Sequence, residues 1–135
     1  MNVRSLRHRD EQGVVAMEFM LVISMLVVVF LLMLQYAVRA HAQRIATGAA
    51  EEGLAAATAY EGTAADGERV AAGYLNKLSP GLQHPSIETN RTSTTASVLV
   101  AGEVTQLIPF LPVEVHVRVE GPVERFVDES STGAP

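Results

Sequence analysis

Glu18 places a carboxylate inside a stretch of residues that is otherwise apolar. It follows the apolar residues 14–17 and precedes twenty residues, 19–38, that carry no formal charge. An ionised carboxylate in apolar surroundings is costly unless it reaches water or a positively charged partner. In a helix, Glu18 lies about 6 Å from the start of the stretch. Its side chain can therefore reach lipid headgroups, or it pairs with a cation.

The other residues that often carry chemistry form no catalytic or metal-binding pattern. The chain has no cysteine, which excludes disulfides and cysteine-based metal sites. There is no serine nucleophile motif, no glycine-rich phosphate loop and no H-E-x-x-H. We expect solvent-exposed roles for Glu51 and Glu52, and for His116 on the polar face of a strand. None of the four histidines has a second ligand at a zinc-type spacing: His8, His41, His84 and His116.

The charge balance argues against a nucleic-acid surface. The 135 residues include 10 Lys and Arg against 15 Asp and Glu, a formal net charge of −5. Nucleic-acid binding needs clustered positive charge. We expect a protein that is not an enzyme and that has no metal, no cofactor, no small-molecule substrate and no nucleic-acid partner.

The stretch that holds Glu18 is long enough to cross a bilayer. Twenty helical residues span roughly 30 Å, the thickness of the hydrocarbon core. Twelve of the residues 19–34 are Leu, Ile, Val or Phe, and their insertion is worth roughly −4 to −7 kcal/mol in total. This exceeds the cost of about 2.5–3.5 kcal/mol for a carboxylate at the centre of a membrane helix. The sequence therefore predicts a transmembrane helix over residues 14–38.

The flanking residues favour a cytoplasmic N-terminus. Arg4, Arg7 and Arg9 precede the apolar stretch, whereas Arg39 and Arg44 follow it, and positive charge is enriched on the cytoplasmic side. A short head before a long tail favours the same orientation. A cleavable secretory signal is an alternative, because residues 40–42 have the A-x-A form, but the apolar stretch exceeds the usual 7–15 residues of such signals.

The residues around Glu18 resemble a known processing signature. The run RDEQGVVAMEF places Gly13 directly before the apolar stretch and Glu18-Phe19 five residues later. This pattern resembles type IV pilins, and more closely the TadE-like pseudopilins of the Tad (tight adherence) pilus system. The small-residue stretch at residues 46–55 is similar to the one that follows the helix in that family. One departure is Ser24, where TadE-like helices often carry proline, so a kink in the middle of the helix is in doubt.

The resemblance implies a processing site and a role for Glu18. In that family a prepilin peptidase in the membrane cuts after the glycine, here between Gly13 and Val14, and the helix is retained. Cleavage frees the α-amine of Val14, whose ordinary pKa is about 7.7–8.0. Glu18 lies one helical turn away and can pair with that amine or with the amine of a neighbouring subunit. Glu18 and Phe19 are thus the residues that the resemblance assigns to subunit docking and register.

The function implied by the resemblance is that of a minor pilin or pseudopilin. Major Flp pilins are typically much shorter, so the additional domain of this chain indicates a minor component. The implied partners are the lipid bilayer of the cytoplasmic membrane, prepilin peptidase, other Tad/Flp pilins and the membrane assembly platform. Two alternatives remain: an uncleaved bitopic membrane protein whose outer domain binds a partner, and a domain secreted after cleavage at Ala42.

After the membrane, the helix is expected to continue to about residue 61. Apolar residues recur there at spacings of three and four along one face, which Leu54 interrupts. The chain's own C-terminal region or a neighbouring pseudopilin helix covers this face. Its members are small for the most part: Val38, Ala42, Ile45, Ala49, Gly53, Ala56 and Tyr60.

A second helix and a sheet are expected beyond a break at residues 61–63. Thr63 and Asp66 fit a capping pattern, and residues 79–81 end the helix. Residues 121–122 resemble a turn. The segments rich in Val, Thr and Ile predict a small antiparallel sheet with strands at 86–91, 95–100, 113–120 and 123–127.

The fold class predicted is therefore α+β and pilin-like. The segments are a cytoplasmic leader (1–13), a transmembrane helix (14–38), an amphipathic extension (39–61), an extracytoplasmic domain (62–128) and a disordered tail (129–135). The apolar segment from Gln106 to Pro112 contains two prolines, which exclude a regular ladder. It is either a loop that closes the small core or an exposed docking patch.

Overall fold

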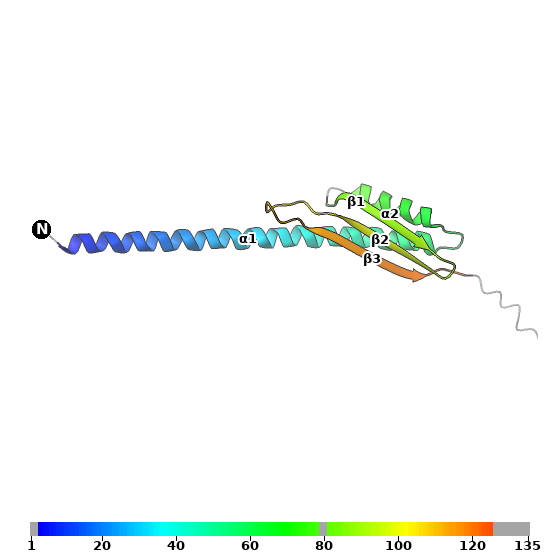
Figure 1. Cartoon of the computed structure of the whole chain (residues 1–135), viewed down its shortest axis with the longest axis horizontal. Coiled ribbons are helices and arrows are strands. Elements are labelled where there is room, and N and C mark those ends of the chain that lie inside the picture. Colours follow the sequence, from blue (N-terminus) through cyan, green and yellow to red (C-terminus); the bar gives the residue numbers. More distant parts are fainter. Residues whose placement is uncertain (1–2, 79–80, 126–135) are drawn as a thin grey trace, which may run out of the picture.

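A long helix projects from a small two-layer domain in the computed structural model of the chain (Figure 1). The structure describes residues 3–78 and 81–125, with side chains from Gly13 onward. The elements follow one another as two helices and then three strands. This confirms the predicted α+β class. The predicted disordered tail, 129–135, lies outside the described residues.

Helix α1 runs without interruption from Val3 to Thr58. Its 56 residues correspond to about 84 Å at the helical rise. Leu, Met and Ala favour the helix, and the strongly apolar stretch contains no proline. The hydroxyl of Ser24 donates to the carbonyl oxygen of Met20 at 2.8 Å. The hydroxyl is thus hydrogen-bonded within the helix and needs no water molecule as a partner. The helix continues through Ser24 without a break.

The C-terminal half of α1 is buried by the chain's own domain along a face of small residues. The alanines with no exposed surface are Ala42, Ala46, Ala49, Ala50 and Ala57. This confirms the prediction that the C-terminal region packs there. The prediction of this apolar face was wrong at its C-terminal end. Helix α1 stops at Thr58, and Tyr60, which was expected on the face, lies beyond the helix and is 63% exposed. Leu54, expected to break the pattern, packs half-buried against the core.

Helix α2 spans Ala64–Leu78 and begins with the predicted cap. The backbone N–H of Asp66 donates to the hydroxyl of Thr63 at 3.1 Å, and the N–H of Thr63 donates to a carboxylate oxygen of Asp66 at 3.1 Å. These reciprocal bonds form a capping box. The hydroxyl of Thr63 and the guanidinium of Arg69 also donate to this carboxylate, each at 2.6 Å. The bond from the Thr63 hydroxyl, followed by those from Arg69 and from the N–H of Thr63, holds the pKa of Asp66 below its ordinary value of 3.8.

Three antiparallel strands form one sheet in the order β1-β2-β3. They span Gln83–Arg91, Thr95–Glu103 and Glu114–Pro122. Along β2 and β3, buried valines alternate with more exposed residues, as expected for a sheet covered on one face. Val98 pairs with Val119 and Val100 with Val117, so the buried side chains of the two strands form a continuous apolar surface.

The end of the sheet differs from the sequence-based expectation. Gly121 and Pro122 do not form a turn: they extend β3 and pair with Ala96 and Thr95. Proline is tolerated here because it lies at the end of an edge strand, where a missing N–H breaks no interior ladder. The predicted fourth strand is absent over residues 123–125, and its last two residues lie outside the described part.

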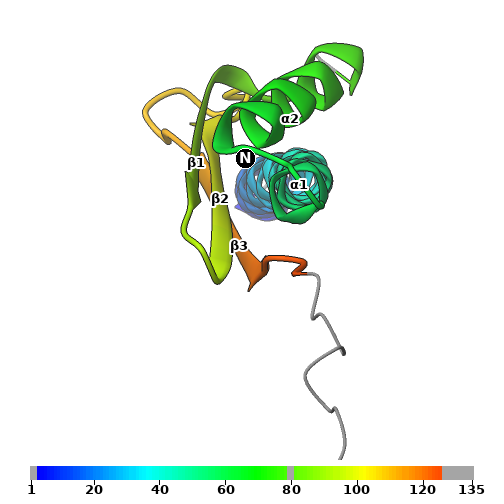
Figure 2. The ribbon, with the colours of Figure 1, turned by 90° about the vertical axis from the view of Figure 1, so that its right-hand side faces the viewer.

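Both helices pack on the same face of the sheet. The end-on view shows α1 beside β2 and β3, and α2 beside β1 (Figure 2). The largest fully buried side chains are Val98, Val100 and Val115. The core is thus a thin layer in which valines of the sheet and a few larger side chains, Ile45, Leu75 and Leu82, pack against alanines of the helices. Small residues let the backbones of the two helices approach closely, as at Gly53 and Gly67.

Candidate functional site

The predicted processing site lies inside helix α1. Gly13 and Val14 are both exposed, and no atom outside the local helix lies within 4 Å of the position of a Cβ on Gly13. The approach to this peptide bond is therefore open. A protease binds its substrate in an extended form, so cleavage here would require the helix to unwind, which glycine favours through its low helix propensity.

Glu18 and Phe19 lie on the exposed surface of the same helix. Glu18 stands four residues after Val14, so the two face the same side, one turn apart. Among the side chains that the structure describes, from Gly13 onward, no lysine, arginine or histidine forms an ion pair with Glu18. Phe19 is 65% exposed. The helix thus presents a carboxylate and an aromatic side chain next to each other. Both are exposed and can bind a partner outside the described part of the chain.

The apolar part of α1 projects clear of the domain. It is long and apolar enough to cross a membrane, and its most apolar stretch is not buried by any other described part of the chain (Figure 1). The helix surface becomes buried from Gln35 onward. Gln35 therefore marks the base of the domain.

Gln35 joins α1 to the segment between β2 and β3. Its side-chain oxygen accepts a hydrogen bond from the backbone N–H of Leu107 at 2.8 Å, and its amide nitrogen donates to the carbonyl oxygen of Thr105 at 3.4 Å. Gln35 is only 4% exposed, so its side chain lies largely out of water, although both bonds are only partly buried. No pattern in the sequence singles out Gln35. One glutamine at the end of an apolar stretch does not reveal partners 70 and 72 positions away.

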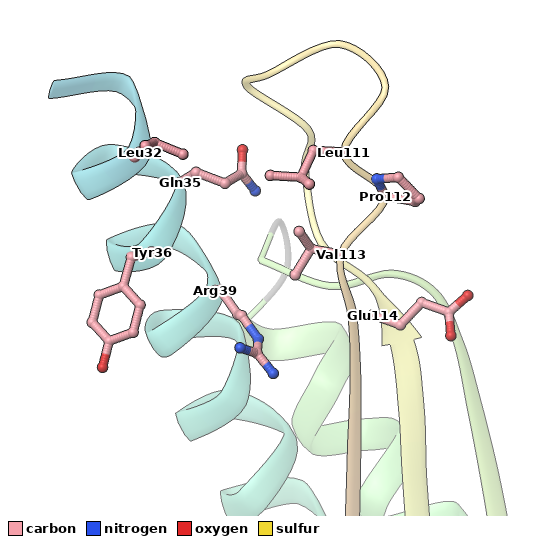
Figure 3. Close-up of a pocket in the computed structure, with 8 residues that line it drawn as sticks. All are labelled: Leu32, Gln35, Tyr36, Arg39, Leu111, Pro112, Val113 and Glu114. Carbon is pink, nitrogen blue, oxygen red and sulfur yellow. The ribbon is translucent and has the colours of Figure 1, made fainter. Parts of the chain in front are cut away.

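A groove of about 430 Å³ lies next to this joint, between α1 and the segment that leads into β3 (Figure 3). Leu32, Tyr36 and Arg39 line it from the helix. Leu111 and Glu114 line it from the opposite side. The groove is apolar at the level of Leu32 and charged at the level of Arg39 and Glu114.

The segment from Gln106 to Pro112 is exposed and does not close the core. Phe110 is 99% exposed, and its backbone has a positive φ of 71°. Leu107 and Leu111 are 38% and 42% exposed. Only the neighbouring valines, Val104 and Val113, pack against the core. Of the two alternatives for this segment, the exposed patch is the one present in the structure.

The described ionisable residues do not gather into a reaction centre. His84 lies 3.5 Å from Glu103, and His116 lies 3.1 Å from Glu114, with all four side chains exposed. No group of three or more metal-ligating side chains is found within the described residues. The features that stand out are thus the exposed helix and the base of the domain.

Comparison with known proteins identifies part of α1. A family model described as TadE-like protein matches residues 13–54, which begin at the predicted processing glycine and include Glu18 and Phe19. Neither the curated proteins nor the solved structures give a match. The matched segment contains the exposed helix and most of its small-residue face, whereas α2 and the sheet lie beyond it. Residues 13–54 are therefore similar to the TadE-like family, as the sequence motif predicted, and the long apolar helix fits a single-pass membrane protein.

Proposed function

We propose that this chain is a minor pilin or pseudopilin of the Tad/Flp pilus. It is a non-enzymatic subunit that prepilin peptidase cuts between Gly13 and Val14. The first 13 residues form a cytoplasmic leader, and residues 14–38 remain as the anchor in the cytoplasmic membrane. The α+β domain then lies outside the membrane, where it meets other pilins and the assembly platform.

The placement of Glu18 carries this proposal. It lies one turn after Val14 on an exposed apolar helix, and no described side chain from Gly13 onward forms an ion pair with it. An unpaired carboxylate in a low-dielectric environment is costly, whereas an ion pair in the correct register offsets much of that cost. Cleavage creates an amine at the position where such a pair can form. Glu18 and Phe19 then select the register of this subunit against its neighbours.

The N-terminal residue of the protein recovered from membranes tests the proposal. We expect Val14 in cells with an active prepilin peptidase, and Met1 or Asn2 in otherwise identical cells without it. A Gly13→Leu variant should remain uncut, because the added side chain obstructs the protease and favours the helix. Gly73→Ala is the matched control: Gly73 lies in α2 with open space around it, and this variant should be cut normally.

Two other outcomes would replace the proposal. Met1 or Asn2 in the presence of active peptidase would indicate an uncleaved bitopic protein. Gln43 would indicate a domain released after Ala42. Each outcome corresponds to a different mass of the recovered chain, so intact-mass spectrometry distinguishes all three.

A further inference from the structure

We propose that the segment from Thr105 to Val113, here called the β2–β3 loop, is a second membrane contact that inserts into the outer interface of the bilayer beside α1. This inference rests on the membrane span of α1. It is independent of cleavage at Gly13 and of any role in a pilus.

The loop lies at the depth where the membrane part of α1 ends. It is the part of the domain that reaches furthest toward the N-terminus of α1 (Figure 1). Gln35 fixes it to the helix at this level through the backbone of Thr105 and Leu107. Leu111 lines the groove together with Leu32, which belongs to the apolar stretch of α1 (Figure 3). The apolar surface of the helix is thus continuous with that of the loop.

The composition of the loop fits the boundary between hydrocarbon and headgroups. No charged residue occurs between Glu103 and Glu114. On the helix, Tyr36 lies near the end of the apolar stretch and Arg39 follows it, and both residue types are favoured where a membrane helix leaves the hydrocarbon. Within the described residues Arg39 forms no ion pair, so it is available for a lipid phosphate. Charged residues therefore begin at the same level on α1, at Arg39, and after the β2–β3 loop, at Glu114.

The geometry of the loop favours insertion. Phe110 is 99% exposed, and its left-handed backbone (φ 71°) is a conformation that costs energy for a bulky residue. Two prolines, Pro109 and Pro112, restrict the backbone on either side. A restricted loop loses little conformational entropy on binding. An exposed aromatic ring at this position finds favourable surroundings in lipid, which is already the environment of the adjacent helix.

Single tryptophans measure the depth of the loop directly, because the chain contains none. Phe110→Trp in the full chain, reconstituted in phosphatidylethanolamine–phosphatidylglycerol vesicles, is compared with two aromatic controls. Phe30→Trp reports the interior of the span, and Tyr60→Trp, two residues beyond the end of α1, reports the end of the domain far from the membrane. Brominated lipids quench indoles in the bilayer, and acrylamide quenches indoles in water.

We expect Phe110→Trp to be quenched by brominated lipid, with blue-shifted emission, and to be protected from acrylamide several-fold relative to Tyr60→Trp. Quenching of Phe110→Trp by acrylamide alone would overturn the proposal. Protection from both quenchers that disappears on dilution of the protein in lipid would also overturn it, since a second copy of the chain would then be covering the loop. Phe30→Trp tests the membrane span in the same preparation. A loop that does not insert can therefore be distinguished from a helix that does not span the membrane.

Discussion

Gly53 and Gly67 lie against each other where α1 and α2 cross. A Cβ on Gly53 would stand 2.9 Å from the carbonyl oxygen of Gly67, and a Cβ on Gly67 would stand 2.8 Å from the carbonyl oxygen of Gly53. The backbone of each helix thus occupies the space that a side chain on the other glycine would fill. This contact brings α2 close enough to cover the alanine face of α1.

Alanine at either glycine should therefore destabilise the domain. Gly53→Ala gains up to about 1 kcal/mol of helix propensity, but overpacking against an immobile backbone costs about 1–3 kcal/mol. Chemical unfolding in detergent, followed by circular dichroism, should show a net loss of stability. Gly73→Ala has the same propensity gain with nothing within 4 Å, and should be neutral or stabilising. Equal effects of the two variants would contradict the proposed backbone contact.

Loss of the Gln35 side chain should release the β2–β3 loop. Gln35→Ala leaves the N–H of Leu107 and the carbonyl of Thr105 without their partner, at a cost of about 1–3 kcal/mol. Amide hydrogen exchange at Leu107 should accelerate. Gln35→Glu keeps the acceptor for Leu107 but loses the donor to Thr105, and so separates the two bonds. Gln43→Ala, exposed on the same helix, is the control. Unchanged exchange at Leu107 in Gln35→Ala would show that the loop is held by other contacts.

Neutralising Glu18 should weaken subunit association and leave processing intact. The peptidase site precedes this residue, whereas the proposed ion pair forms only after cleavage. Breaking a buried ion pair costs about 3–5 kcal/mol, so Glu18→Gln should reduce co-purification with partner pilins by at least about tenfold. Glu52→Gln, an exposed carboxylate further along α1, controls for loss of charge. Normal assembly of Glu18→Gln would remove the register role from Glu18.

The start of α2 should lose stability at acid pH. The pKa of Asp66 is lowered in the folded chain, mainly by its hydrogen bonds from Thr63. A lowered folded-state pKa means that the stabilisation is complete above the unfolded value, near 3.8, and is lost as the pH falls through the folded-state pKa.

Thermal unfolding of the wild type and Asp66→Asn across pH 3–7 measures this contribution. The stability difference between the two proteins should be constant near neutrality and should shrink below the ordinary pKa of the carboxyl. Glu68→Gln is the control on the same helix, at an exposed position without the capping bonds. A difference that does not change with pH would exclude the Asp66 carboxylate as its source.

Local patterns predicted much of this fold. The apolar stretch, the cap at Thr63 and Asp66, and the alternation in residues 113–120 each depend on near neighbours. The end of β3 was mispredicted, because the pairing of Gly121 and Pro122 with β2 depends on where the β1–β2 hairpin begins. A glycine and proline pair reads locally as a turn, and only the sheet register overrides that preference.

The candidate site was predicted unevenly for the same reason. The motif around Gly13 and Glu18 occupies seven consecutive residues, 13–19, and is visible in the sequence. The joint at Gln35 connects residues more than 70 positions apart, and no local pattern reports it. The reciprocal contact of Gly53 and Gly67 is likewise tertiary. Both features depend on how the domain folds back along α1.

The unbroken course of α1 couples the direction of Glu18 to that of the sheet. Each residue of a helix turns the chain by about 100°, so the number of residues between Glu18 and Gln35 sets the azimuth at which the carboxylate points when the domain faces a given way. Inserting two residues into this stretch would rotate Glu18 to nearly the opposite side, whereas inserting seven would return it to within about 20° of its original azimuth. Helix α1 thus fixes the direction of Glu18 relative to the domain, in addition to its proposed role as an anchor.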